Sequence, residues 1–174
     1  MPQVFGSPVP GVLYLADPDP GWPRVFGAHE LRIRDALGGA AVRVEHIGST
    51  SVPGLAAKPV VDVLVTVRDV TAEEDYLPAL LAAGYVLRRR EPGHRLLRTQ
   101  DGDVNVHVHD DDSTAAADYL LLRDHLRRDP GDRALYERTK RRLLKRAWPD
   151  GAGYAEAKTE VVEQIKDRAR QLCQ

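Results

Sequence analysis

Cysteine is almost absent from this chain, whose single thiol is Cys173, one residue before the C-terminal end. One cysteine supports neither an intrachain disulfide nor a cysteine-rich zinc site, and this usage is typical of a reducing compartment. No apolar run approaches the roughly 20 residues that span a bilayer, and no basic segment followed by an apolar one marks an N-terminal secretion signal. We therefore predict a cytoplasmic protein that does not enter a membrane.

The chain also lacks an excess of charge of either sign. The 25 Lys and Arg residues nearly cancel the 26 Asp and Glu residues, which leaves a formal net charge of −1. A balanced charge gives no global attraction to nucleic acid or to an anionic membrane surface. We therefore expect neither as a general partner, and the sequence leaves the oligomeric state open.

Local patterns predict the order helix, two strands, helix, three strands, three helices. Proline and glycine concentrate in residues 1–21, which we expect to form an extended N-terminal arm. With 43% apolar residues, residues 1–174 are enough for one α+β domain that has a mixed sheet and a helical C-terminal layer over 113–172. The expected helices are 22–37, 71–84, 113–128, 132–147 and 153–171, and the expected strands are 42–47, 60–67, 85–90, 94–99 and 103–109.

Two helix starts depend on particular residues. Trp22 precedes Pro23 at the start of the first helix, and we interpret its ring as a packing anchor rather than a ligand contact. Thr71 stands three residues before Glu74, which is the spacing of a capping box. Thr71 is therefore predicted to cap the helix that ends at Gly84.

A Gly-Ser loop between the first two predicted strands is the stretch around which the chain is organised. Gly48, Ser49, Thr50 and Ser51 interrupt the strands, and Asp62 is the carboxylate within the apolar second strand. Backbone N–H groups and hydroxyls beside a strand-borne acid suit an anionic ligand that is held with a metal ion. Because an unpaired buried carboxylate is costly, Asp62 belongs either to a site or to an ion pair.

Two basic side chains flank this loop. Lys58 lies close to Asp62 in sequence, and it could bind a phosphate or carboxylate as a point charge or pair with a surface acid. His46 ends the first strand, and we expect its ring to be satisfied by backbone beneath the loop.

The last strand of the predicted meander carries polar side chains on one face. Asp103, Asn105, His107 and His109 alternate with valines, so they share one side of the strand. That side is either a solvated exterior or the wall of a cleft. In a cleft, His107 and His109 could act as acid/base groups. With Asp62 they could also hold a divalent metal in a mixed nitrogen–oxygen site, which suits Zn²⁺ or Mn²⁺ better than Mg²⁺.

A longer motif resembles a known family. The string His46-Ile47-Gly48-Ser49-Thr50-Ser51-Val52-Pro53-Gly54-Leu55, then Ala57-Lys58-Pro59 and Asp62, resembles the signature of the GrpB family. That family is a branch of the nucleotidyltransferase superfamily, which has the polymerase β-like fold, and it also occurs fused to some dephospho-CoA kinases. The resemblance implies a nucleotidyltransferase-like fold in which Gly48 and Ser49 hold nucleotide phosphates and Asp62 binds a divalent metal such as Mg²⁺. The second acid expected two residues after Asp62 is replaced by Leu64.

The resemblance also indicates residues in the helical part. Arg123 and the pairs Tyr136–Lys140 and Tyr154–Lys158 are similar to recurrent positions of the family. Residues four apart share a helix face, so each pair could present a hydroxyl and an ammonium to a ligand. The resulting substrate-binding candidates are Gly48, Ser49, Thr50, Ser51, Lys58, Asn105, Arg123, Tyr154 and Lys158.

A basic run closes the second of the three C-terminal helices. Residues 138–146 contain six basic side chains and no acid: Arg138, Lys140, Arg141, Arg142, Lys145 and Arg146. Such a run is either a solvated face or a surface for a phosphate-bearing partner. Aromatic residues do not interleave it, which disfavours single-stranded nucleic acid.

Three functions remain open from the sequence. The first is a nucleotidyltransferase-like enzyme that binds a phosphate- or carboxylate-bearing small molecule, with a divalent metal (Mg²⁺, Mn²⁺ or Zn²⁺) and a nucleotide as cofactors. The second is an NTP-independent acid/base enzyme that uses Asp62, His107 and His109 on a small anionic metabolite. The third is a binding or folding-accessory module without catalysis. Fold resemblance by itself does not decide among them.

Overall fold

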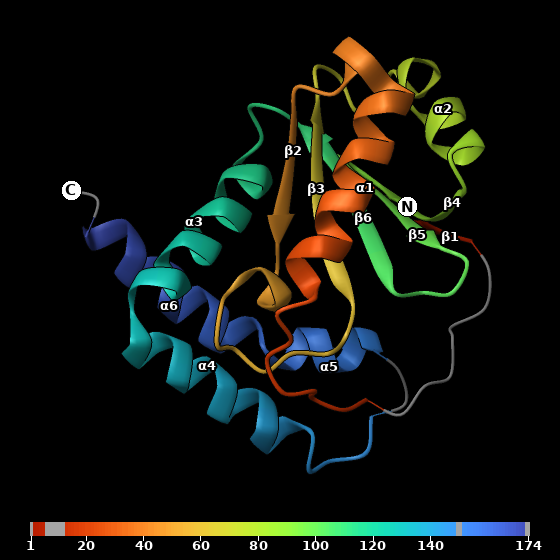
Figure 1. Ribbon diagram of the computed structural model, residues 1–174. Helices are drawn as coiled ribbons and strands as arrows, with labels where there is room; N and C mark the ends of the chain where they lie inside the picture. Colours follow the sequence, from red (N-terminus) through yellow and green to blue (C-terminus); the bar gives the residue numbers. More distant parts are fainter. Residues whose placement is uncertain (1, 6–12, 149–150, 173–174) are drawn as a thin grey trace.

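A central six-stranded sheet carries helices on both faces in the computed structural model (Figure 1). The structure describes residues 2–5, 13–148 and 151–172. The strands lie in the order β1-β4-β5-β6-β3-β2; β3 and β6 run parallel, and the other neighbours are antiparallel. Their bounds are β1 Gln3–Val4, β2 Arg43–Ile47, β3 Val61–Val67, β4 Tyr85–Glu91, β5 His94–Thr99 and β6 Val104–Asp110.

The helices divide into two groups. Helices α1 and α2 pack on one face of the sheet, and α3 covers the other face with α4, α5 and α6 beyond it (Figure 1). The predicted α+β class, with a mixed sheet and a helical C-terminal layer, is confirmed. The bounds are α1 Trp22–Leu37, α2 Leu77–Ala82, α3 Thr114–Arg128, α4 Pro130–Leu143, α5 Gly151–Ala157 and α6 Thr159–Leu172.

The predicted capping box at Thr71 is wrong. The Thr71 hydroxyl donates to Asp69 Oδ1 at 2.5 Å, and a 3₁₀ turn, Glu73–Asp75, precedes the short helix α2. Glu73 instead accepts hydrogen bonds from Arg90 and Arg95 across the sheet. The Thr71 hydroxyl therefore closes a local turn with Asp69 rather than capping a helix.

The C-terminal helices differ from the prediction at their ends. Helix α4 begins at Pro130, two residues before the predicted start, because Asp129 is the N-cap and its carboxylate accepts a hydrogen bond from the Asp132 N–H at 2.8 Å. The predicted last helix is two helices, since Lys158 lies in a turn between α5 and α6. Trp22 is buried against the core on α1, as expected of a packing anchor.

The two faces of the sheet separate core from site. The valines of β3 and β6 pack under α1 and α2. Asp62 and Leu64 alternate with them in β3, and the parallel register places Asp62 beside Asn105 and Leu64 beside His107. Because successive side chains of a strand point to opposite faces, Asp62, Asn105 and His107 lie on the side of the sheet that faces α3.

Two short backbone pairings connect the described part of the N-terminal arm to the rest of the fold. Strand β1 pairs with β4, and Ala16 forms an isolated antiparallel bridge with Ala57. Residues 1 and 6–12 of the arm, residues 149 and 150 of the predicted interhelical break, and Cys173 lie outside the described residues. Within the described ranges, no helix has the length and apolar composition that a membrane span requires.

Candidate functional site

The Gly-Ser loop folds as a tight turn next to the first residues of β3. Gly48 has φ +73°, a backbone conformation that glycine adopts readily, and residues Ser49–Ser51 form one 3₁₀ turn. Ser51 Oγ donates to the Gly48 carbonyl at 2.5 Å. This turn leaves Gly48 and Ser49 on the wall of a cavity, whereas the Ser51 hydroxyl is used inside the loop.

His46 anchors the loop from beneath. Its Nε2 lies 2.9 Å from Thr50 Oγ1, and its ring stacks on Phe26 with centroids 4.9 Å apart. Burial, with a further contribution from the nearby Arg127 charge, lowers the pKa of His46 to about 4. The ring is therefore neutral near pH 7. Its partner is a threonine side chain rather than the backbone that we expected, so the Thr50 hydroxyl is engaged as well.

Asp62 lies where β3 meets β6. Its Oδ1 accepts a hydrogen bond from Asn105 Nδ2 at 3.0 Å and lies 3.1 Å from His107 Nε2. Burial opposes ionisation of this carboxyl, but hydrogen bonding and the charge of His107 outweigh it, so the pKa of Asp62 is lowered. The structure thus brings the Gly-Ser loop, Asp62, Asn105 and His107 together at one place.

His109 occupies a different position. It is 5% exposed and stacks on His94 with ring centroids 4.5 Å apart. Neither ring nitrogen has a hydrogen-bond partner among the described residues. Burial, together with the neighbouring His94 and His107, lowers the pKa of His109 to about 4. Its ring is therefore neutral near pH 7, and it packs beside His94 rather than binding Asp62.

The donor set at Asp62 does not have the geometry of a metal centre. Among the described residues, the group of His, Cys, Asp or Glu side chains whose ligand atoms all lie within 4.8 Å of one another is His125, Asp129 and Asp132. Asp62, His107 and His109 do not form such a group, and we derive no step through a metal ion there. At the α3–α4 junction, Arg168 Nη2 and Nε already bind the two carboxylate oxygens of Asp132 at 2.5 and 3.0 Å.

A buried lysine supports the loop from the helical side. Lys140 of α4 is 2% exposed, and its Nζ donates to Ser49 Oγ at 3.1 Å and to the Ala56 carbonyl at 2.6 Å. The ammonium also lies 4.7 Å from the centre of the Tyr136 ring. Burial, with repulsion from Lys158, lowers the pKa of Lys140 to about 7. The sequence analysis names Lys140 with Tyr136 as a pair that could face a ligand, but it does not predict the contact with Ser49.

Two further cations face the same region. Burial and the Arg98 charge lower the pKa of Lys58, whereas Asp62 raises it. Lys158 also favours the ionised form of Asp62. Within the described part of the chain, no salt bridge involves Lys58, Lys140 or Lys158. Asp62 and Glu137 act on these lysines at longer range, so all three ammonium groups stay without a direct ion pair among the described residues.

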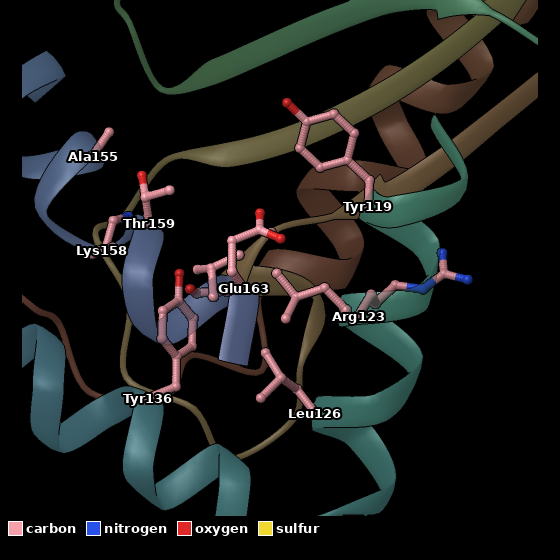
Figure 2. A pocket seen from close by; sticks show the side chains of 12 residues that line it. Tyr119, Arg123, Leu126, Tyr136, Ala155, Lys158, Thr159 and Glu163 are labelled. Carbon is pink, nitrogen blue, oxygen red and sulfur yellow. The ribbon is translucent and has the colours of Figure 1, made fainter. Parts of the chain in front are cut away.

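A cavity of about 280 Å³ opens between the loop and the helices (Figure 2). Its wall is mainly apolar, with side chains from α3, α4 and α6 (Figure 2). Its polar groups include Ser49 of the loop, Arg123, Lys158, Thr159 and the Glu163 carboxylate, which pairs with Lys166. The lining residues include Ser49, Tyr119, Leu122, Leu126, Tyr136 and Val162. An apolar wall with a few polar groups is the usual composition of a small-molecule site.

Arg123 and Tyr154 have partly structural settings. Arg123 Nη1 donates to Glu45 Oε2 at 2.8 Å and to the His46 carbonyl at 3.1 Å, so this cation is already paired. Tyr154 is buried, and its hydroxyl has no partner among the described residues. The Lys158 ammonium lies 4.7 Å from the centre of the Tyr154 ring, so these two side chains are in contact with each other.

Five members of the basic run, residues 138–146, are exposed, and Lys140 alone points inward. Arg141 pairs with Glu137 on the same helix at 2.8 Å. The solvated-face interpretation therefore fits most of the run, and the buried member belongs to the candidate site. The helical spacing of Tyr136 and Lys140 indicates Lys140 as a candidate. Its contact with Ser49, 91 residues earlier in the chain, cannot be predicted from the local sequence.

Comparison with known proteins gives a matching family and several similar proteins. A model described as the GrpB protein family matches residues 13–168. A UPF0157 protein of Streptomyces coelicolor is 56% identical over 96% of this chain and 89% of that protein. A dephospho-CoA kinase of Mycolicibacterium paratuberculosis is 32% identical over 90% of this chain, which spans only 44% of the kinase.

Solved structures agree with the sequence matches. The crystal structure of conserved protein GrpB from Enterococcus faecalis superposes with a TM-score of 0.80 at 28% identity, over 92% of this chain and 100% of that one. The structure of Cid1 in complex with its short product ApU has a TM-score of 0.52 at 14% identity, over 76% and 43% of the two chains. This second likeness shows the nucleotidyltransferase-like fold alone. The chain belongs to the GrpB family.

Proposed function

We propose that this chain binds a small molecule bearing a phosphate or carboxylate group, with the anionic group at Ser49 and the organic part in the adjoining cavity. The observation that carries the proposal is the set of three lysines around Ser49 and Asp62 without a salt bridge among the described residues. Burying like charges next to one another is unfavourable unless an anion compensates them.

Lys140 lies behind Ser49 rather than on the cavity wall, and it is held in place before any ligand arrives. Its Nζ is fixed by the Ser49 hydroxyl and the Ala56 carbonyl, so little conformational freedom is lost when an anion binds. An anion near Nζ would raise the pKa of Lys140 from its lowered value of about 7. Binding at slightly alkaline pH would then be accompanied by proton uptake.

The cavity wall favours an organic part that is flat or apolar. Tyr119 and Tyr136 border the cavity with leucines of α3 (Figure 2), and aromatic rings gain from stacking on planar groups. A volume of about 280 Å³ fits a metabolite-sized ligand, near the lower end of ordinary small-molecule sites. A nucleotide satisfies both requirements, and so does an aromatic or acyl metabolite that carries a terminal anion.

Metal-dependent nucleotidyl transfer is the most specific form of this proposal. It requires carboxylates that hold the cations neutralising the transferred phosphoryl group. Leu64, at the position of the second acid, is fully buried with Ile47 and Ala116. The chain therefore offers Asp62 without that partner, and nucleotide binding alone is the part of this hypothesis that the cavity and the lysines support.

The contact between Asp62 and His107 favours a second candidate, acid/base chemistry on an anionic metabolite without NTP. Their 3.1 Å separation couples a carboxylate to an imidazole beside the cation-lined cavity. Such a pair can take a proton from a bound hydroxyl or carbon acid, or return one to it. In this version the lysines hold the ligand's anionic group while Asp62 meets the reacting atom.

Isothermal titration tests the binding proposal directly. The probes are ATP, GTP and CTP with and without Mg²⁺ or Mn²⁺, inorganic triphosphate, and citrate as a metal-free carboxylate. We expect binding by at least one probe that weakens about tenfold in Lys158→Gln, because a cation next to the ligand is lost. The matched control is Lys145→Gln on the exposed end of the basic run, which should bind like the wild type.

The pattern of binding separates the two candidates. Heat only when a nucleotide and a divalent metal are present supports the nucleotidyltransferase hypothesis. Heat with triphosphate or citrate alone supports the metal-free acid/base site. If no probe binds, or if Lys145→Gln weakens binding as much as Lys158→Gln does, the proposed site is wrong.

A further inference from the structure

Four ionisable side chains form a continuous row across the sheet, one from each of four neighbouring strands. Glu91 Oε2 on β4 lies 2.9 Å from His94 Nδ1 on β5, His94 Nε2 lies 3.2 Å from His107 Nδ1 on β6, and His107 Nε2 lies 3.1 Å from Asp62 Oδ1 on β3. Each imidazole thus uses both ring nitrogens inside the row. The sequence candidates contained neither Glu91 nor His94.

Counting protons shows what this row must hold. Three hydrogen bonds need three protons, whereas two neutral imidazoles carry only two and an ionised carboxylate carries none. When all three hydrogen bonds are made, the row holds one proton more than two neutral histidines between two ionised carboxylates. A mixed row of this kind shares its protons, and its titration belongs to the group rather than to one residue.

The excess proton can reach either end without any hydrogen bond being lost. When it is at Glu91, both imidazoles are neutral and carry their proton on Nε2. One proton then moves from Glu91 to His94 Nδ1, one from His94 Nε2 to His107 Nδ1, and one from His107 Nε2 to Asp62. Three bonds to hydrogen break and three form, and the result is a protonated Asp62 with both imidazoles again neutral.

The ends of the row are open and its middle is sheltered. The Glu91 and Asp62 side chains are 29% and 28% exposed, whereas those of His94 and His107 are 16% and 15% exposed. His109 stacks on His94, and the Tyr119 ring contacts the rings of both His107 and His109. The other titratable or charged groups that act on the row are Lys58, Arg89, Arg98 and Lys158.

We propose that Glu91, His94 and His107 form a proton relay that exchanges protons between solvent on the β4 side and Asp62, which lies against Gly48 on the wall of the ligand cavity. This inference rests on the proposed function, because the cavity gives Asp62 something to protonate or deprotonate. His94 and Glu91 touch no ligand and act through His107. The relay restores the protonation state of Asp62 from behind while a bound ligand blocks it from the front.

Solution NMR tests the relay on the whole chain without any ligand. The measured quantities are the ¹³C carboxyl shifts of Asp62 and Glu91 and the ¹⁵N ring shifts of His94 and His107, each against pH. We expect all four to share inflections in the wild type. In His94→Gln, the Asp62 curve should lose the inflection that it shares with Glu91, because the row is cut.

A second variant and a control keep the test decisive. Glu91→Gln keeps an acceptor for His94 but removes the charge, and we expect the His94 titration to move to lower pH. Asp101→Asn, an exposed acid in the turn between β5 and β6, should leave every curve unchanged. Independent curves in the wild type, or an unmoved His94 in Glu91→Gln, would overturn the relay.

The outcome is distinguishable from that of the binding proposal. No ligand is added in the NMR titration, so unlinked titrations contradict the relay and leave the lysine-lined site as it stands. Conversely, the absence of binding in calorimetry contradicts the ligand site, and linked titrations would still show a shared row of protons. A folded control spectrum for each variant is read from the dispersion of its backbone amide signals.

Discussion

Gly48 lies so close to Asp62 that a Cβ atom built on it would stand 2.7 Å from Asp62 Oδ2. The contact fixes the height of the Gly-Ser loop above the carboxylate, because any larger residue would push the two apart. Asp62 Oδ1 is at the same time held by Asn105 and His107. The loop and the acid are therefore positioned by each other, and the cavity is formed at their junction.

We predict that Gly48→Ala destabilises the protein by ~2–4 kcal/mol, through a left-handed backbone and a steric clash with Asp62. The matched control is Gly54→Ala. Gly54 also has positive φ, +76°, but a Cβ atom placed on it would meet nothing within 4 Å. That control should lose only the backbone part, about 1 kcal/mol. Urea unfolding of both variants measures the difference, and equal losses would mean that the clash relaxes at no cost.

Lys140 should make the stability depend on pH above neutrality. Its pKa falls from 10.5 to about 7 on folding, chiefly by burial, so between these values the unfolded chain binds the proton more tightly. The free energy of unfolding therefore rises with pH over this window. In Lys140→Met we expect the rise between pH 7 and 9 to flatten in urea titrations. Lys145→Met, at an exposed position just after α4, should keep it; a slope unchanged in Lys140→Met would contradict the assignment.

Glu73 should control how the free energy of unfolding changes at acid pH. The hydrogen bonds from Arg90, and then from Arg95, lower its pKa from 4.5 to about 2 against the opposing effect of burial. Its stabilisation is thus complete above about pH 4.5 and lost as the pH falls toward 2, with a size of ~2 kcal/mol once solvent screening is allowed for. Glu73→Gln should lower stability at pH 7 and narrow the difference between pH 7 and pH 3. Glu74→Gln, an exposed neighbour, serves as the control and should retain the wild-type acid transition.

The group of His125, Asp129 and Asp132 should gain metal affinity when Arg168, the cation that binds Asp132, is replaced. Arg168 binds both oxygens of Asp132, and His125 Nε2 lies 2.7 Å from Oδ2. In Arg168→Met we expect Zn²⁺ to raise the unfolding temperature, because a ligand that binds only the folded state stabilises it. The wild type should show a smaller rise. A rise of equal size in both proteins would show that Arg168 does not compete with the ion.

Local signals in the sequence predicted most of the fold. An apolar run predicted β3, alternating valines predicted β6, and the helix predicted over 113–128 is α3, with Ser113 as its N-cap. Glycines with positive φ lie where the helix and the strands were predicted to end, at Gly84, Gly93 and Gly102. These predictions held because hydrophobic period, capping and turn chemistry act over a few residues. The capping box at Thr71 was wrong because the Thr71 hydroxyl binds Asp69 and the chain makes a 3₁₀ turn before α2 begins at Leu77.

The sequence by itself determined the family, the Gly-Ser loop, the acid Asp62 and the polar face that carries Asn105, His107 and His109. Only the tertiary structure decided which of these meet, since Asp62 and His107 are 45 residues apart in the chain and the parallel register of β3 and β6 follows from packing. That register placed His107 against Asp62, whereas the antiparallel pairing of β5 with β6 placed His109 beside His94. The fold also brought Lys140 to Ser49 across 91 residues, because burial of helix faces, not sequence proximity, sets such contacts.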